Sequence, residues 1–242
     1  MYNNPLRYTD PTGHIGDPDR DYGGHGNYDE YHLSSQPRFI PAIVRYIHGE
    51  MKGNAVGTEA AVMRACLKYR GPNKAVLNII ARISWGSMVA DWRLNRLLWA
   101  AYPQYRDMVL VGQWDHKRVL GNSDLTPDPA IPEEGYSWIG DAQYRSDIWA
   151  NMAYGYTGAA LGFSETELLS GAGMEQVLSD LASRQRPRHS RDAPTWLAGW
   201  DDPYDVASIQ LGYALWMEYG TQLYPIDIYR ALQKTTGLLR RP

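Results

Sequence analysis

The segment RSDIWANMAYGYTGAALGFS (residues 145–164) constrains the fold more than any other part of the 242-residue chain. Its apolar and small residues cover nearly every side of a helix, and such a helix has to be buried. Gly155, Gly158 and Gly162 lower helix propensity, which indicates that another backbone approaches closely. The sequence therefore predicts a buried helix that begins near residue 146 and runs towards residue 160.

Helical periodicity continues through most of the chain after residue 37. Further helices are expected in RFIPAIVRYIHGEM, GTEAAVMRACLKYRG with a cap at Thr58, NKAVLNIIARISW, VADWRLNRLLWAAY, SETELLSGAG, MEQVLSDLASRQ, DVASIQLGYALWMEYG and PIDIYRALQKTTG. Ser164 and Glu167 have the spacing of a capping box. Residues 121–140 and 186–203 are expected to be loops, and DMVLVGQW is the one short strand candidate. The fold class predicted is mainly α.

Composition sets limits on the function. Hydrophobic residues make up 44% of the chain, which is enough to bury a core, and the net charge of −3 is not typical of a strong polyanion binder. The single cysteine, Cys66, excludes an intrachain disulfide and is expected to be a small core residue. We find no transmembrane segment and no apolar signal sequence in the first thirty residues.

Asp147, Asn151 and Tyr154 form the first candidate site. They are spaced i, i+4 and i+7, so they share one face of the buried helix. A buried polar stripe needs partners, water or a metal ion. The alternative is a hydrogen-bond network in which Asp147 complements the positive N-terminal end of the helix dipole.

The segment GWDDPYDVASIQLGY forms the second candidate. Asp202 is a good N-cap, with Pro203 at the first helical position and Asp205 at the third, and capping alone explains these residues. The alternative is a cluster of carboxylates, including Asp201, that holds a hard divalent cation such as Ca²⁺ or Mg²⁺.

Two further segments carry titratable or cationic residues. In GQWDHKR, the neighbours Asp115, His116 and Lys117 combine an acid, a possible general acid or base and a cation. SRQRPRHSR is either a phosphate-binding cluster or a solvated loop, and its arginines are Arg184, Arg186, Arg188 and Arg191.

The segment PLRYTDPTG (residues 5–13) resembles the closing motif of the core of Rhs (YD-repeat) proteins. Those proteins enclose a C-terminal toxin, and a leucine commonly follows the motif where this chain has His14. The resemblance implies that residues 1–37 are the end of an Rhs core with a flexible acidic linker. Residues 38–242 would then be a compact helical toxin domain carried by the Rhs core and its secretion apparatus.

Four further motifs resemble the polymorphic toxin type 44 family, over roughly residues 110–235. They are WDHK, DIWANMAYGYTGAALGFS, LLSGAG and DDPYDVASIQLGYALW. Relatives carry His where this chain has Ala153. The resemblance implies an antibacterial toxin, delivered on contact into a target bacterium and neutralised by a cognate immunity protein.

The spacing of the acidic residues is similar to that in secreted, Ca²⁺-dependent helical toxins that cleave lipid II. This similarity implies a hydrolase that acts on a phosphate or pyrophosphate ester of a lipid-linked cell-wall precursor in the target periplasm. The expected cation ligands are Asp147, Asp202 and Asp205, the expected catalytic residues His116, Asp115, Asp147 and Asn151, and the expected substrate-binding residues Lys117, Tyr154, Arg184 and Arg188.

Two alternatives remain from the sequence. One is a ribonuclease that acts in the target cytoplasm, with His116 as base and with Lys117 or the arginine cluster on phosphate. The other is a non-enzymatic binding or pore-forming toxin.

Overall fold

The structure is a computed structural model. The residues it describes are 40–89, 114, 116, 120, 135–182, 186, 189–190, 194–238 and 240–241. The predicted Rhs remnant and linker, most of VADWRLNRLLWAAY and all of DMVLVGQW except Trp114 lie outside these residues. No helix in the described part combines the length and the apolar character that crossing a membrane requires.

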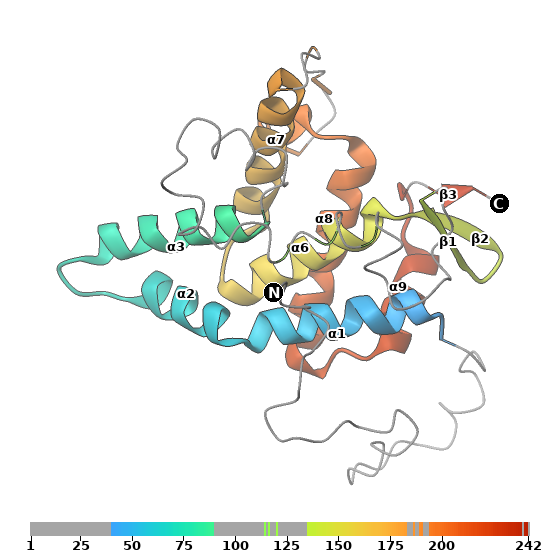
Figure 1. Ribbon diagram of the computed structural model, residues 1–242, viewed down its shortest axis with the longest axis horizontal. Helices are drawn as coiled ribbons and strands as arrows, with labels where there is room; N and C mark the ends of the chain where they lie inside the picture. Colours follow the sequence, from blue (N-terminus) through green and yellow to red (C-terminus); the bar gives the residue numbers. More distant parts are fainter. Residues whose placement is uncertain are drawn as a thin grey trace, which may run out of the picture. The chain divides into compact units, whose positions relative to one another are not determined.

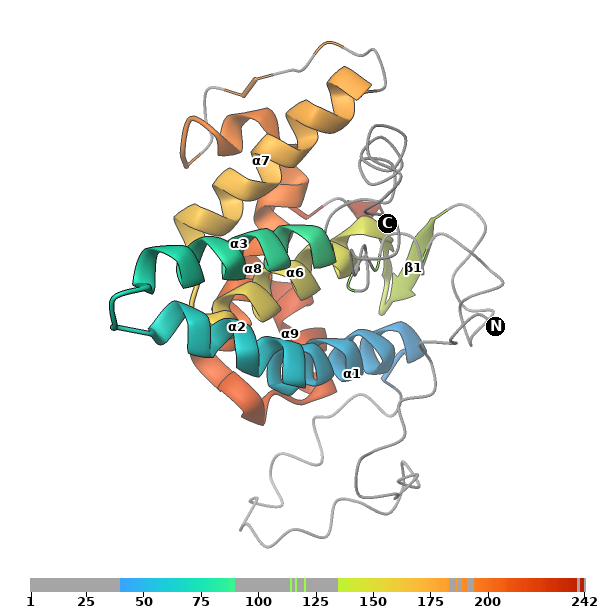
Figure 2. The ribbon, with the colours of Figure 1, turned by 60° about the vertical axis from the view of Figure 1, so that its left-hand side comes forward.

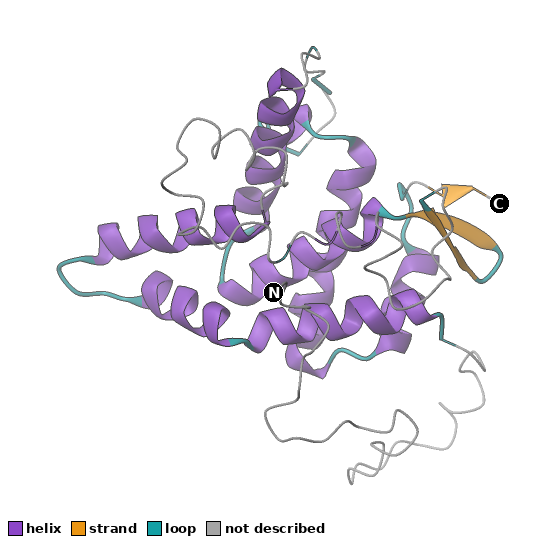
Figure 3. Ribbon diagram, viewed as in Figure 1, coloured by secondary structure: helices purple, strands orange, loops and turns teal. Residues whose placement is uncertain are grey.

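Helices dominate the described residues, which confirms the mainly α prediction (Figures 1 and 3). The helices are α1 (Ala42–Val56), α2 (Thr58–Lys68), α3 (Lys74–Val89), α6 (Asp147–Leu161), α7 (Glu165–Ala182), α8 (Pro203–Tyr219) and α9 (Pro225–Lys234). Two short 3₁₀ helices, η3 (Ala198–Trp200) and η4 (Gly220–Gln222), precede and follow α8.

Helix α6 is the predicted buried helix, and it packs along α8. A Cβ atom added to Gly155 would lie 2.1 Å from the carbonyl oxygen of Ile209 on α8. A Cβ atom added to Gly212 of α8 would lie 1.9 Å from the carbonyl oxygen of Met152. The two backbones are therefore in direct contact at reciprocal glycines, as predicted for Gly155. Gly162, in contrast, is the left-handed C-cap of α6 and has no atom within 4 Å of an added Cβ.

The core surrounds this helix pair in two clusters. In the first, α1 and α9 contribute Ile47, Met51 and Ile228 to a cluster that contains Trp149 and Tyr156 of α6. In the second, α2, α3 and the beginning of α7 pack around side chains that include Trp85, Trp114, Phe163, Leu168 and Ile209. Helices α2 and α3 lie side by side as a hairpin (Figures 1 and 2).

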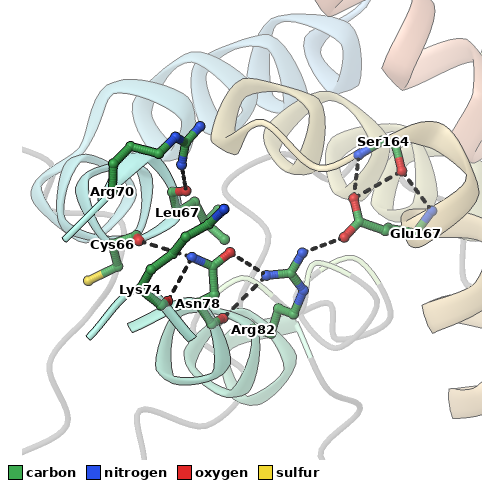
Figure 4. A network of polar contacts seen from close by, with 8 residues as sticks. All are labelled: Cys66, Leu67, Arg70, Lys74, Asn78, Arg82, Ser164 and Glu167. Carbon is green, nitrogen blue, oxygen red and sulfur yellow. Dashed lines mark hydrogen bonds and ion pairs between the residues drawn. The ribbon is translucent and has the colours of Figure 1, made fainter. Parts of the chain in front are cut away.

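A polar network joins the α2–α3 hairpin to α7 (Figure 4). Arg82 of α3 forms a 2.6 Å ion pair with Glu167 and a 3.1 Å hydrogen bond to the side chain of Asn78. Asn78 donates in turn to the carbonyl of Cys66 on α2 at 3.4 Å. Glu167 and Ser164 also form the predicted capping box, at 2.9 and 3.3 Å.

A small antiparallel sheet of β1 (Tyr136–Ile139), β2 (Ala142–Arg145) and β3 (Arg240–Arg241) was not predicted. The prediction of a loop over residues 121–140 is wrong for β1. Gly140, at φ 66°, provides the turn between β1 and β2. Four-residue strands are too short to show clear alternation, and β3 pairs with residues almost 100 positions earlier in the sequence.

Three further details differ from the predictions. SETELLSGAG and MEQVLSDLASRQ belong to one continuous helix, α7. Gly173 does not end a helix; instead it lets α7 approach Leu197, whose carbonyl oxygen would lie 1.9 Å from an added Cβ. Thr58 is the first residue of α2 rather than its cap, which is Gly57, and Cys66 is half-buried at the edge of the second core cluster.

Candidate functional site

One face of α1 carries the polar residues Tyr46, Glu50 and Asn54, spaced i, i+4 and i+8. These side chains surround His116. The Asn54 amide nitrogen lies 3.3 Å from His116 Nε2, and Glu50 Oε2 lies 3.9 Å from His116 Nδ1. The Tyr46 ring meets the imidazole edge-on, with 6.4 Å between centroids. Because the Asn54 N–H donates to Nε2, the proton of the neutral imidazole lies on Nδ1, towards Glu50.

Burial controls the protonation of this cluster. His116 is 4% exposed, and burial lowers its pKa from 6.5 to about 4, so the ring is neutral near pH 7. Burial also raises the pKa of Glu50, although 30% of its side-chain surface remains exposed. The pKa of Tyr46 is raised by burial and, to a smaller extent, by the charge of Glu50. Glu50 is therefore the acidic group of this cluster that solvent can reach.

His116 was predicted from the sequence as a site residue, whereas Tyr46, Glu50 and Asn54 were not. Their i, i+4, i+8 spacing on an amphipathic helix was a usable signal for a polar stripe. The partner of this stripe could not be predicted from the neighbouring sequence, because Asn54 and His116 are 62 residues apart.

The polar stripe of α6 has separate partners for each of its members. Asp147 forms a 2.7 Å ion pair with Arg145, and Asn151 donates a 2.7 Å hydrogen bond to Asp205 on α8. Tyr154 donates to the carbonyl oxygen of Leu168 at 3.0 Å, and burial raises the pKa of its hydroxyl. This arrangement corresponds to the hydrogen-bond alternative in the sequence analysis.

Asp202 is the N-cap of α8, as predicted. Its carboxylate accepts a 3.0 Å hydrogen bond from the backbone N–H of Tyr204, and Pro203 begins the helix. Asp201, which is buried, accepts from the Asp202 N–H at 3.0 Å. The contact of Asp202 with Tyr204 is the one that capping requires.

The three carboxylates expected to hold a cation have different neighbours in the structure. Within the ranges that the structure describes, no three side chains of His, Cys, Asp or Glu are grouped so that they could hold a metal ion. Asp147 pairs with Arg145, Asp202 caps α8 and Asp205 accepts from Asn151. The folded helices thus give each of these carboxylates a different neighbour, and the divalent cation expected for them stays a prediction from the sequence.

Four expected site residues, Asp115, Lys117, Arg184 and Arg188, lie outside the described residues, as does Arg191. Arg186 of the arginine cluster is described and is exposed. The roles expected for the other residues stay predictions from the sequence.

Comparison with known proteins gives one result. No curated protein and no solved structure matches the chain. Residues 109–218 match the model of the family "bacterial toxin 44", which confirms the resemblance seen in the motifs. The match includes His116, Asn151 and Asp205, whereas Glu50 and Asn54 lie before it. The matched region of the chain, residues 109–218, is therefore a bacterial toxin 44 domain.

Proposed function

We propose that this chain cleaves RNA, with Glu50 as the general base and His116 as the residue that positions it. The observation that supports the proposal is the cluster of His116 with Glu50 and Asn54 of α1. It combines a reachable carboxyl group with a buried neutral imidazole.

Glu50 has the properties of a general base. Such a group works best when its pKa lies close to the working pH and when a substrate can reach it. Burial moves the pKa of Glu50 upward, and its carboxyl group is still partly exposed. His116 is almost inaccessible, so it acts through Glu50 rather than on the substrate. This assignment moves the acid–base role expected for His116 to its neighbour.

RNA is the phosphodiester that suits such a base. Its 2′-hydroxyl is an internal nucleophile: Glu50 takes the hydroxyl proton, the 2′ oxygen attacks the adjacent phosphorus, and the 5′ oxygen leaves and takes a proton from water. A lipid-linked pyrophosphate has no such internal nucleophile. Its expected cleavage depended on a cation shared by Asp147, Asp202 and Asp205, which have other neighbours. The ribonuclease alternative therefore has the better structural support.

The toxin family also suggests a cognate immunity protein, and it is consistent with delivery into target cells. The Rhs carrier, its secretion apparatus and a phosphate contact by Lys117 stay predictions from the sequence.

The place of killing tests the substrate class. The full chain is expressed in a susceptible bacterium with and without a periplasmic signal sequence, and growth and total RNA are followed. We expect killing from the cytoplasm together with RNA fragmentation. Killing only from the periplasm, with intact RNA, would overturn the ribonuclease proposal and restore the cell-wall hypothesis.

The role of Glu50 is tested with Glu50→Gln, which keeps the shape of the side chain but cannot take a proton. Cleavage of RNA by the purified full chain should fall by about 10²–10⁴-fold, while the melting temperature stays close to that of the wild type. Glu59→Gln, in the first turn of α2, is the matched control and should cleave normally. Full activity of Glu50→Gln would remove Glu50 from the mechanism.

A further inference from the structure

Three aromatic side chains gather at the surface beside η3, and we call them the aromatic platform: His189, Trp196 and Trp200. Ring centroids are 4.7 Å apart for His189 and Trp200, 5.6 Å for His189 and Trp196, and 5.8 Å for Trp196 and Trp200. We propose that the platform is a binding site on which a base of single-stranded RNA stacks. The choice of RNA rests on the proposed function.

Backbone contacts hold the platform in place. His189 Nε2 lies 2.9 Å from the carbonyl oxygen of Trp196, and the Ser190 N–H donates to the carbonyl of Gly199 at 2.6 Å. A Cβ atom on Gly199 would lie 2.5 Å from the Ser190 carbonyl oxygen and 2.7 Å from His189 Nε2. The glycine therefore lets the segment of His189 lie directly against η3, and Thr195 fixes the beginning of η3 by accepting from Ala198 at 3.0 Å.

Trp196 presents most of its indole ring to solvent. Its exposed fraction is 68%, although Trp200 and His189 lie against it. A ring that is held by neighbours but open to solvent loses little freedom when a ligand stacks on it. Aromatic side chains of this kind are the usual support for unpaired bases, because every base has a flat face to offer.

The sequence that contains His189 is cationic. His189 belongs to the segment SRQRPRHSR (residues 183–191), which contains four arginines and no acidic residue, in a chain with a net charge of −3. Arg186 of this segment is exposed. Arginine binds phosphate oxygens through its planar guanidinium group, and the combination of aromatic rings with cations is typical of single-strand binding. A neutral glycan would use the rings but would offer no charge to the exposed Arg186.

Binding is measured by fluorescence anisotropy of the full chain with a fluorescein-labelled, fully 2′-O-methylated oligonucleotide, which has no free 2′-hydroxyl and is not cleaved. Trp196→Ala should weaken binding by about 5- to 100-fold, and Trp196→Phe should retain most of the affinity. Trp138→Ala, at another exposed tryptophan (53%) on β1, is the matched control and should bind as the wild type. Melting curves should be unchanged for each variant.

Two results would overturn the inference. One is equal affinity of Trp196→Ala and Trp138→Ala for the oligonucleotide. The other is binding of an N-acetylglucosamine tetrasaccharide that Trp196→Ala abolishes, without any binding of the oligonucleotide, which would make the platform a glycan site. Because the oligonucleotide is not cleaved, loss of binding in Trp196→Ala and loss of cleavage in Glu50→Gln are measured separately, and either proposal can fail alone.

Discussion

The α6–α8 contact and the α1–His116 contact both place polar side chains in largely apolar surroundings, but they differ in how closely those groups are paired. Between α6 and α8, Asn151 and Asp205 are 2.7 Å apart beside backbones in direct contact. Between α1 and His116, the polar distances are 3.3 and 3.9 Å, and the pKa values of His116 and Glu50 are both shifted by burial.

The difference distinguishes a contact that holds two helices together from a contact whose groups can take part in a reaction. A short hydrogen bond beside a glycine contact fixes how two helices cross. Loosely paired titratable groups, with one of them reachable, can exchange a proton. The α6 stripe can be recognised in the sequence because its spacing is local, whereas the α1 cluster needs a partner from a distant segment.

The largest expected effect is at the glycine contact between α6 and α8. Gly155→Ala places a methyl group 2.1 Å from the backbone carbonyl oxygen of Ile209, so the helices have to separate. We expect a loss of about 3 kcal/mol or more in the free energy of unfolding, at the upper end of overpacking effects. Urea unfolding followed by circular dichroism measures it.

Gly49→Ala in α1 is the matched control, since no atom lies within 4 Å of its added Cβ. It should stabilise the protein by about 0.5–1 kcal/mol through helix propensity. Equal stability of the two variants would show that α6 and α8 are not in backbone contact.

The second effect is a pH dependence of the unfolding free energy, and it arises at the α1–His116 contact. Because the folded pKa of His116 is about 4 and its ordinary value is 6.5, the unfolded chain binds more protons between these values. The stability contributed by neutral His116 is complete above about pH 6.5 and is lost as the pH falls towards 4, by about 3 kcal/mol.

His116→Gln cannot show this loss. The difference in unfolding free energy between wild type and His116→Gln should therefore shrink by about 3 kcal/mol between pH 7.5 and pH 4. His48, whose pKa is also lowered by burial, is present in both proteins and cancels in the comparison. A difference that does not change with pH would contradict the burial of His116.

A third and smaller effect separates the two regions directly. Asn151→Ala removes the donor to Asp205 and should cost about 1–3 kcal/mol of stability. The RNA cleavage rate of the folded protein should stay close to that of the wild type, because Asn151 belongs to the packing contact. A variant as stable as the wild type but inactive would move the site back to α6.

The smallest effect is at the N-cap of α8. Asp202→Ala loses one hydrogen bond to the Tyr204 N–H and should cost about 1 kcal/mol. The cost should be the same with and without added Ca²⁺, as thermal melts would measure. A Ca²⁺-dependent rise in melting temperature that Asp202→Ala abolishes would instead support the cation site expected from the sequence.

Several elements could be predicted because their causes are local. The apolar residues around α6 required burial, Gly155 indicated close packing, and Asp202 with Pro203 specified the beginning of α8. The motifs in the region from His116 to Asp205 were sufficient to indicate the toxin family.

Only the tertiary structure decided which polar groups meet. It gave Asp147, Asp202 and Asp205 separate partners, paired β3 with β2, and brought Glu50 of α1 to His116. The physical reason is the distance along the sequence over which each effect acts. Capping, helix propensity and amphipathic spacing act within a few residues. The environment that shifts the pKa values of Glu50 and His116 exists only once distant helices exclude water between them.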